Sequence, residues 1–178
     1  TSFIKTIAGA NRPPLNVLHN PMMAELNSAL ESLVGADVAA IVFRAEGKAF
    51  SAGVDVADHE GEKAADMIRL FHGIFRKQAA TDALTVALVQ GAALGGGCEV
   101  ACFCDIILAS DKAKFGQPEV QVGVIPPVAA CMFPLRVGLA KAVELTALGE
   151  TVPAAEAHRI GLISHVYPVE EFAARAEA

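Results

Sequence analysis

Residues 91–99 form a glycine-rich segment that separates an apolar run at residues 83–89 from a predicted short helix. The first N–H groups of a helix point outward, and the helix dipole favours a negative charge beside them. A phosphate-binding loop would need a Lys and a hydroxyl after the glycines, but Gly97 and Cys98 stand there, and Ala93 replaces a glycine that a dinucleotide fingerprint requires. The segment therefore indicates an oxyanion hole, in which small residues let a ligand oxygen approach the backbone.

A second backbone donor for such a site is expected in residues 48–55, a turn of small residues that contains Gly53. Glycine can adopt a backbone conformation that other residues avoid. Taken alone, this segment is more typical of an ordinary connection between a strand and a helix. Ser51 within it is a remote candidate nucleophile, because its neighbours offer no evident His–Asp partnership.

Glu99 and Glu119 are the acidic residues that could do acid–base chemistry. Glu99 falls on the first turn of the predicted helix, and Glu119 follows residues 115–118, where Pro118 limits the path of the chain. Either carboxylate alone is more typical of a helix cap or of the surface. If both face one water in a partly apolar site, their pKa values are pushed apart, so that one accepts a proton while the other donates one.

The elements that must position these residues follow from hydrophobic periodicity. Asn20 as the N-cap and Pro21 as the first helical residue begin a helix whose apolar positions continue to Leu33. Further helices are predicted at residues 62–77, directly after residues 95–97, near 137–148 and from Pro153 to Gly161, and buried strands at residues 38–43, 83–89, 106–109 and 162–167. Strands that alternate with helices predict an α/β fold with a mostly parallel sheet covered on both faces.

The composition limits the class of protein. The chain has 178 residues, 53% hydrophobic and 19% charged, which suits one domain with its own core. A net charge of −6 argues against nucleic acid as a partner, since such binding depends on clustered Lys and Arg. The longest uncharged stretches, residues 83–98 and 120–135, are too short to span a membrane, and no apolar leader follows Thr1, so we expect a cytoplasmic protein with no membrane partner.

The cysteines and histidines predict neither a disulfide framework nor a metal site. The spacings of the five histidines fit no metal set. The cysteines lie in apolar surroundings and are expected to be small buried residues: Cys98, Cys102, Cys104 and Cys131.

The motifs in combination resemble the crotonase (enoyl-CoA hydratase/isomerase) superfamily. The matching segments keep the family's order and spacing over nearly the whole chain: residues 14–17, 48–55, 91–99, 104–105, 115–123 and 157–162. The resemblance implies a crotonase-like ββα spiral. Residues 1–168 would form the acyl-CoA-binding catalytic core, and residues 169–178 would begin a C-terminal helical region that is otherwise largely absent.

The resemblance also implies roles for individual residues. The backbone N–H groups of Val54 and Gly96 would form the oxyanion hole for a thioester oxygen. Glu99 and Glu119 would be the catalytic pair, with Glu99 accepting a proton from water and Glu119 delivering one to the α-carbon. Isomerases of the family commonly keep only one of these glutamates, so the pair favours a hydratase, which is a lyase.

For the substrate, the resemblance implies an acyl-CoA, with Lys48 near the phosphates of coenzyme A and Ala52 near its adenine. Coenzyme A is part of the substrate, so no separate cofactor is expected. A homotrimer or a hexamer is the implied assembly.

The proposed acyl pocket departs from the family pattern. Family hydratases of straight-chain substrates usually have Pro-Gly followed by Gly-Gly-Thr, but this chain has Pro126, Pro127 and Val128 before two alanines. This variant resembles cyclohexa-1,5-diene-1-carbonyl-CoA hydratases of anaerobic aromatic degradation, and the prolines would stiffen a loop beside the acyl group. Alternatives are a general enoyl-CoA hydratase or isomerase of fatty-acid oxidation, another crotonase reaction such as C–C bond hydrolysis, and a non-catalytic acyl-CoA-binding protein of the same fold.

Overall fold

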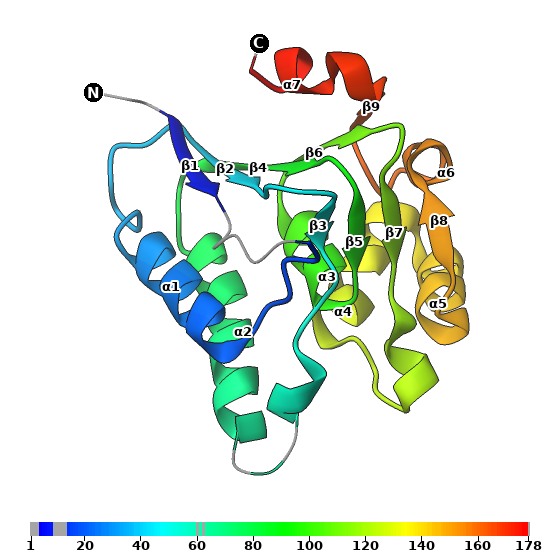
Figure 1. Ribbon diagram of the computed structural model, residues 1–178, viewed down its shortest axis with the longest axis horizontal. Helices are drawn as coiled ribbons and strands as arrows, with labels where there is room; N and C mark the ends of the chain where they lie inside the picture. Colours follow the sequence, from blue (N-terminus) through cyan, green and yellow to red (C-terminus); the bar gives the residue numbers. More distant parts are fainter. Residues whose placement is uncertain (1–3, 9–13, 60, 62, 178) are drawn as a thin grey trace.

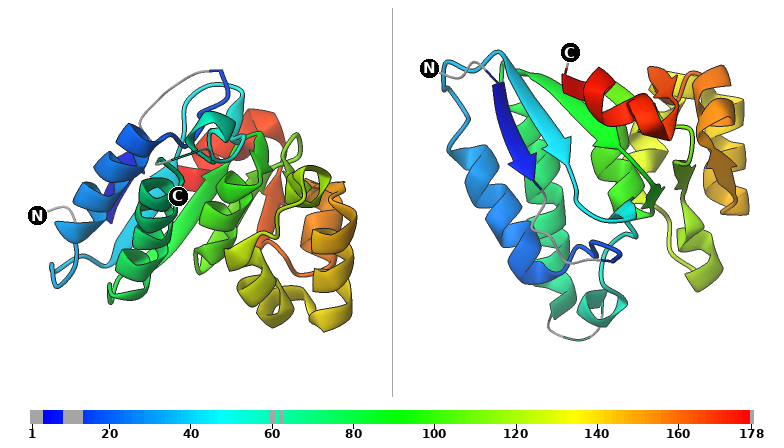
Figure 2. Two further views of the ribbon diagram at one scale, coloured as in Figure 1. Left: turned by 90° about the horizontal axis from the view of Figure 1, so that it is seen from below. Right: turned by 45° about the horizontal axis from the view of Figure 1, so that its top comes forward.

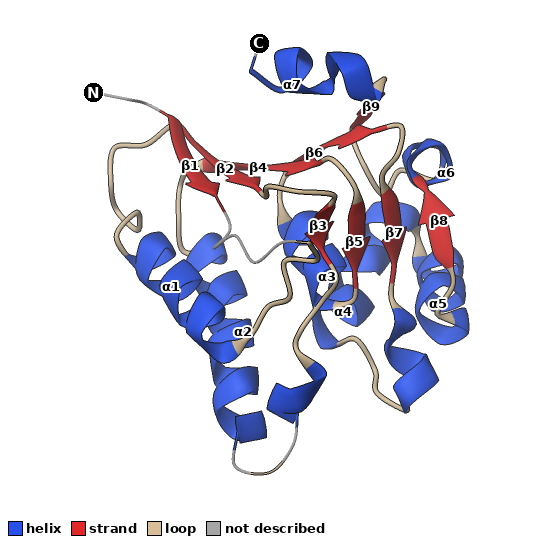
Figure 3. Ribbon diagram, in the orientation of Figure 1, coloured by secondary structure: helices blue, strands red, loops and turns tan. Residues whose placement is uncertain are grey.

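Two β-sheets organise the computed structural model, which describes residues 4–8, 14–59, 61 and 63–177 (Figure 3). The larger sheet has the order β1-β2-β4-β6-β9 and is parallel throughout. The smaller sheet has the order β3-β5-β7-β8, and its β7–β8 pair is antiparallel. The strands are β1 (Ile4–Ala8), β2 (Ala40–Arg44), β3 (Ala49–Ser51), β4 (Leu84–Val89), β5 (Ala92–Leu94), β6 (Ile106–Ser110), β7 (Lys114–Gly116), β8 (Thr151–Pro153) and β9 (His165–Tyr167).

The helices surround the two sheets. Figures 1 and 2 show α1, α2 and α3 on one side of the larger sheet and α7 on the other. The helical elements are α1 (Asn20–Glu31), the 3-10 helix η1 (Val56–His59), α2 (Lys63–Ala79), α3 (Gly96–Phe103), the 3-10 helix η2 (Pro118–Val122), α4 (Pro127–Val137), α5 (Leu139–Leu148), α6 (Ala154–Arg159) and α7 (Val169–Glu177). The predicted α/β class with a mostly parallel sheet is confirmed.

The larger sheet is not covered equally on its two faces. In β2, Ile41 and Phe43 are buried on the side of α1, α2 and α3, whereas Val42 between them is half-buried. The same alternation runs through β4, where Ala87 is buried and Val86 is half-buried. Within the described part of the chain, α7 is the helix that lies on the second face (Figure 1). The prediction of helices covering both faces is therefore only partly correct.

A repeated unit connects the two sheets. Strands β2, β4 and β6 lie side by side in the larger sheet, and the short strands β3, β5 and β7 that follow them lie side by side in the smaller one. Each pair leads into helical structure, so the chain repeats a ββα unit. Because β3, β5 and β7 are parallel neighbours, the segments that follow them meet at one edge of the smaller sheet.

The first predicted helix begins one residue earlier than expected. His19 is the N-cap of α1, and Asn20 is its first helical residue. The backbone N–H of Asn20 donates to Oδ2 of Asp58 at 2.9 Å, so an acidic side chain from η1 supplies the capping interaction. The prediction of Asn20 as N-cap was wrong because this partner is 38 residues away in the sequence.

Helix α4 was not predicted. Pro126 and Pro127 suggested a stiff loop, but Pro126 is the N-cap and Pro127 is the first residue of this 11-residue helix. Proline is compatible with the first turn of a helix, where its missing N–H would have no helical partner. Gly138, with φ of 79°, then separates α4 from the predicted helix α5.

The cysteines follow the prediction with one exception. Cys98, Cys102 and Cys104 are buried, but Cys131 on α4 is exposed. Its burial was inferred from the apolar residues beside it in the sequence. In α4, which was not predicted, Ala129 and Phe133 face the core, and Cys131 does not. No helix in the described ranges has the length and apolar composition needed to cross a bilayer.

Candidate active site

Two glycine-containing segments pack backbone against backbone at the edge of the smaller sheet. Gly53 has a φ of 104°, and a Cβ atom on it would lie 3.0 Å from the Leu94 carbonyl oxygen and 3.6 Å from the Gly96 nitrogen. A Cβ atom on Gly97 would lie 2.5 Å from the Cβ of Ser51. Larger residues at either position would separate the segments that follow β3 and β5.

The Val54 N–H points away from Leu18, the residue with which Val54 pairs. Val54 forms an isolated parallel bridge with Leu18, in which the N–H of Leu18 donates to the Gly53 carbonyl at 2.8 Å and the N–H of Asp55 donates to the Leu18 carbonyl at 3.0 Å. Because polar groups alternate in direction along extended backbone, the N–H of Val54 points to the opposite side. It is thus available to a ligand.

The Gly96 N–H lies beside Val54. Gly96 is the first residue of α3, and the first four N–H groups of a helix have no helical acceptor. A Cβ atom on Gly96 would lie 2.7 Å from Cγ2 of Val54, so the two residues are direct neighbours. The structure therefore brings together the two predicted oxyanion donors at the positive end of a helix.

Glu99 is held by the start of α4. Its side chain is 2% exposed, and its Oε1 accepts the N–H of Val128 at 2.8 Å and that of Ala129 at 2.7 Å. The pKa of Glu99 is raised from its ordinary value of 4.5 to about 7, because burial and, less strongly, the negative charge of Glu119 outweigh the N–H groups of Ala129 and Val128, which lower it. The group can therefore exchange a proton near neutral pH.

Glu119 lies against Gly95, the residue before α3. A Cβ atom on Gly95 would lie 2.8 Å from Oε1 of Glu119. With its amide nitrogen facing the carboxylate, Gln117 donates to both Glu119 oxygens, at 3.1 and 3.0 Å. Burial raises the pKa of Glu119, although the positive charge of His59 acts in the opposite direction.

The pKa values of the two carboxyl groups are both raised by burial, to about 7 for Glu99, and the charge of Glu119 contributes to the rise at Glu99. The separation of the two pKa values stays a prediction. Val54, Gly96 and Glu119 come from the segments after β3, β5 and β7, which explains how residues so far apart in sequence gather at one place. The roles of Gln117 and Ala129 were not predicted: Ala129 reaches Glu99 across 30 residues, and the Gln117 type alone does not show that its amide faces the nearby Glu119.

The residues predicted to contact coenzyme A lie on the segment that leads into Val54. Lys48 is exposed, and Ala52 is half-buried with its N–H bonded to the Leu15 carbonyl at 2.9 Å. Their roles toward coenzyme A stay predictions. The Ser51 hydroxyl is buried and accepts the Gly53 N–H at 3.2 Å, so it supports the turn.

A groove with a volume of about 300 Å³ lies between α2, the end of α3 and the start of α4. Two of the predicted acyl-pocket residues, Pro127 and Val128, line it, and the N–H of Val128 is one of the two that bind Glu99. Pro126 is buried and does not line the groove. The aromatic rings of Phe75 on α2 and Phe103 on α3 form further apolar walls.

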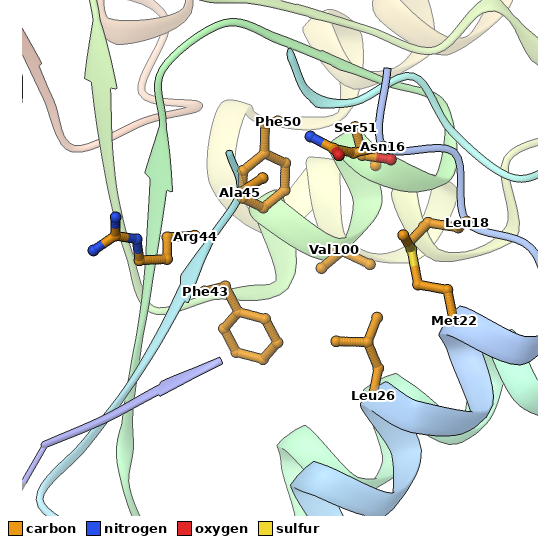
Figure 4. A pocket seen from close by; sticks show the side chains of 11 residues that line it. Asn16, Leu18, Met22, Leu26, Phe43, Arg44, Ala45, Phe50, Ser51 and Val100 are labelled. Carbon is orange, nitrogen blue, oxygen red and sulfur yellow. The ribbon is translucent and has the colours of Figure 1, made fainter. Parts of the chain in front are cut away.

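A second cavity, of about 40 Å³, lies inside the core between α1, β2 and α3 (Figure 4). Leu18, Met22, Leu26 and Phe43 enclose it, and the Arg44 side chain points away from these residues (Figure 4). It holds little more than a water molecule, so it is a packing gap and not a substrate site. Within the described ranges, no group of His, Cys, Asp or Glu side chains could hold a metal ion.

A family model and related sequences both match most of this chain. A family model described as enoyl-CoA hydratase/isomerase matches residues 5–178. A probable enoyl-CoA hydratase of Mycobacterium tuberculosis, echA8, is 42% identical over 172 residues, covering 94% of this chain and 67% of that protein. A cyclohexa-1,5-dienecarbonyl-CoA hydratase of Thauera aromatica is 39% identical over 153 residues, covering 85% of this chain and 59% of that protein.

Solved structures show the same similarity. An enoyl-CoA hydratase from Bacillus anthracis superimposes with a TM-score of 0.93 at 26% identity, covering 99% of this chain and 71% of that one. An enoyl-CoA hydratase from Mycobacterium avium subsp. paratuberculosis gives a TM-score of 0.89 at 30% identity, covering 99% and 70%. The chain thus spans between 59% and 71% of the length of these four proteins.

Proposed function

The chain belongs to the enoyl-CoA hydratase/isomerase family, and we propose that it adds water to a carbon–carbon double bond conjugated with a coenzyme A thioester. The observation that carries this proposal is that Glu99, in the first turn of α3, and Glu119, against Gly95, are close enough to interact electrostatically at the helix start where Val54 and Gly96 meet. The protein is then a hydro-lyase of the enoyl-CoA hydratase type, and the acyl-CoA is its substrate. Coenzyme A arrives with the substrate, and no further cofactor takes part.

The backbone donors stabilise the charge that develops during the reaction. When a water oxygen bonds to the β-carbon, the electron pair of the double bond moves toward the thioester carbonyl, whose oxygen becomes enolate-like. The N–H groups of Val54 and Gly96 donate to that oxygen, and each such donor is typically worth about 2.7–4 kcal/mol in the transition state. Because these amides are fixed by the backbone, they need no reorganisation as the charge forms.

The two carboxyl groups move the protons. Glu99 accepts a proton from the attacking water, and Glu119 delivers one to the α-carbon, so that the hydroxyl and the hydrogen add across the double bond. A pKa near 7 lets Glu99 accept the proton from water as a base and then release that proton before the next turnover. A non-catalytic binding protein would gain nothing from a buried and a half-buried carboxyl group beside an oxyanion hole, because removing such charges from water costs free energy.

For the acyl group, we propose a compact alicyclic dienoyl-CoA, cyclohexa-1,5-diene-1-carbonyl-CoA. The groove at the start of α4 has aromatic walls in Phe75 and Phe103, and Pro127 and Val128 add rigid apolar volume there; the N–H of Val128 connects this groove to Glu99. The relative from Thauera aromatica supports this choice. The second candidate is a straight-chain enoyl-CoA of fatty-acid oxidation, which the mycobacterial relative supports. The homotrimer or hexamer and the cytoplasmic location stay expectations.

The test is to mix the protein with crotonyl-CoA and with cyclohexa-1,5-diene-1-carbonyl-CoA and to follow loss of the conjugated chromophore. We expect Glu99→Gln and Glu119→Gln each to lower the rate by about 10²–10⁴-fold, the usual size of a general acid–base contribution. Glu25→Gln, on the exposed side of α1, is the matched control and should keep the full rate. The proposal fails if neither thioester is consumed or if either site variant keeps the wild-type rate. Faster consumption of crotonyl-CoA would favour the straight-chain candidate.

A further inference from the structure

Helix α4 is attached to α3 at both of its ends. At its N-terminal end, the N–H groups of Val128 and Ala129 bind Oε1 of Glu99, which lies in the first turn of α3. At its C-terminal end, Nε of Arg136 donates to the Cys102 carbonyl at 2.8 Å, and a terminal nitrogen of its guanidinium donates to the Cys104 carbonyl. The two helices are thus connected at the catalytic carboxylate and again where α3 ends.

The Arg136 contacts satisfy a local need of α3. The last carbonyl groups of a helix have no helical N–H partner, and they carry the negative end of the helix dipole. A guanidinium suits this place because it is charged and presents several N–H donors in a fixed plane. Arg136 is half-buried there, so solvent competes little for the two hydrogen bonds.

Helix α4 depends on such external contacts more than an ordinary helix does. Pro134 stands inside it and has no N–H, so one backbone hydrogen bond is missing from its middle. Its buried side chains, Ala129 and Phe133, pack into the core, but apolar packing alone does not fix a helix along its axis. Directional hydrogen bonds at the far end supply that constraint.

We propose that Arg136 is a positioning residue for Glu99: by fastening the C-terminal end of α4 to the end of α3, it keeps the first N–H groups of α4 against the Glu99 carboxylate. This inference relies on the proposed function only for its kinetic test. Arg136 lies eight residues after Val128, which is about 12 Å along a helix, so it acts through the position of α4.

The groups that act on Glu99 determine what loss of Arg136 should do. Glu119 from η2 supplies a negative charge, and α4 supplies the two N–H groups. The neighbouring Cys98 thiol stays neutral, because its hydrogen bond with Cys102 and its burial raise its pKa. If α4 moves, Glu99 keeps its burial and its acidic neighbour but loses N–H groups that favour the ionised form, so its pKa rises.

The kinetic test compares Arg136→Met, which removes both hydrogen bonds, with Arg136→Lys, which keeps a charged donor. In Arg136→Met we expect the acid limb of kcat/KM against pH to move upward by about one unit, as the loss of a charge-assisted hydrogen bond would give. The rate at pH 6 should fall about tenfold while the rate above pH 8 changes little. Arg136→Lys should restore part of the shift. A merely structural role would instead lower the rate by the same factor at every pH.

A measurement without substrate separates this inference from the proposed function. The Glu99 side-chain carbon can be titrated by ¹³C NMR in the free protein, with Glu99→Gln used to assign its signal. A higher midpoint in Arg136→Met supports the inference even if the wild-type protein hydrates nothing. An unchanged midpoint in folded Arg136→Met overturns it.

A matched control and a milder variant complete the design. Ile41→Val, in the buried side of β2, destabilises the fold without contacting α4 and should leave the midpoint in place. If Arg136→Met does not fold, the same titration is done on Arg136→Lys. A Glu99 midpoint above that of wild type by up to one pH unit supports the inference, and a midpoint equal to that of wild type overturns it.

Discussion

The Glu99 carboxylate is subject to two opposing influences. Its burial disfavours the charged form, and two N–H groups at the start of α4 favour it. Burial is the larger influence, so the pKa of Glu99 rises to about 7. A base with this pKa is well matched to proton transfer at neutral pH, but the ionised group opposes folding.

Glu99→Gln should therefore stabilise the folded protein at high pH. Because the pKa of folded Glu99 lies above its unfolded value, the penalty is complete above pH 7 and shrinks as the pH falls toward 4.5. We expect the free energy of unfolding to increase by about 1–3 kcal/mol at pH 8 and by less than about 1 kcal/mol at pH 5. Urea unfolding at both pH values measures this. An equal change at the two pH values, with Glu25→Gln unchanged at both, would show that the buried charge is not the cause.

At the residue scale, the sequence identified candidates but not their partners. Glu99 and Glu119 could be selected because carboxyl groups beside a glycine-rich helix start suggest acid–base chemistry. The contacts with Ala129 and Gln117 could not be selected, since backbone N–H groups look alike in any sequence and an amide side chain has many uses. Their importance arises only after folding brings them to the carboxylates.

The start of α3 and the turn after β3 hold the two proposed oxyanion donors, Gly96 and Val54. Their backbones approach so closely that only glycine fits at position 97. A Cβ there would lie 2.5 Å from the Cβ of Ser51 and 2.6 Å from its carbonyl oxygen. The turn would have to move, and Val54 would move with it.

Gly97→Ala should consequently separate the two donors. Overpacking of this kind typically costs about 1–3 kcal/mol of stability. We expect kcat to fall by about 10²-fold or more in the folded fraction, because one donor of an oxyanion hole is misplaced. Gly73→Ala on α2 is the comparison, since its Cβ would crowd the buried Asn27 side chain and so overpack the fold away from Val54 and Gly96. Steady-state kinetics at a temperature where both variants are folded measure the difference. An equal kcat in Gly97→Ala and Gly73→Ala would contradict the prediction.

At the element scale, length was only part of what made a strand predictable. Strands β2, β4 and β6 are five or six residues long and apolar, and the sequence predicts them. Strands β3, β5, β7 and β8, with three residues each, were missed. The three-residue β9 lies inside the predicted strand at residues 162–167, whereas the five-residue β1 was not predicted. Helix α4 was missed because consecutive prolines suggest a loop unless the helix start is already known.

The arrangement of the two sheets brings the parts of the site together. The larger sheet carries most of the buried strand residues, and the smaller sheet places the ends of β3, β5 and β7 next to one another (Figure 1). Each of these ends supplies one part of the site: Val54, Gly96 and Glu119. The resemblance of separate motifs to one family could predict this gathering, whereas periodicity alone could not, because it carries no information on strand order in a second sheet.

Binding of a saturated thioester should stabilise the molecule as a whole. Butyryl-CoA has no double bond to hydrate, and at 100 times its Kd it should add about 2.7 kcal/mol to the free energy of unfolding. Lys48→Ala should reduce this gain at equal ligand concentration if Lys48 contacts the phosphates. Lys112→Ala, also exposed, should keep it. Thermal unfolding with and without ligand measures the difference, and an equal gain in both variants would exclude Lys48 from the coenzyme A site.

The most direct test of the central claim is the infrared stretching frequency of the thioester carbonyl in butyryl-CoA bound to the wild-type protein, with a ¹³C label to identify the band. If the N–H groups of Val54 and Gly96 both donate to this oxygen, the carbonyl is polarised and its frequency falls below the value in water. A frequency equal to that in water, or higher, would contradict the claim that these two residues form an oxyanion hole.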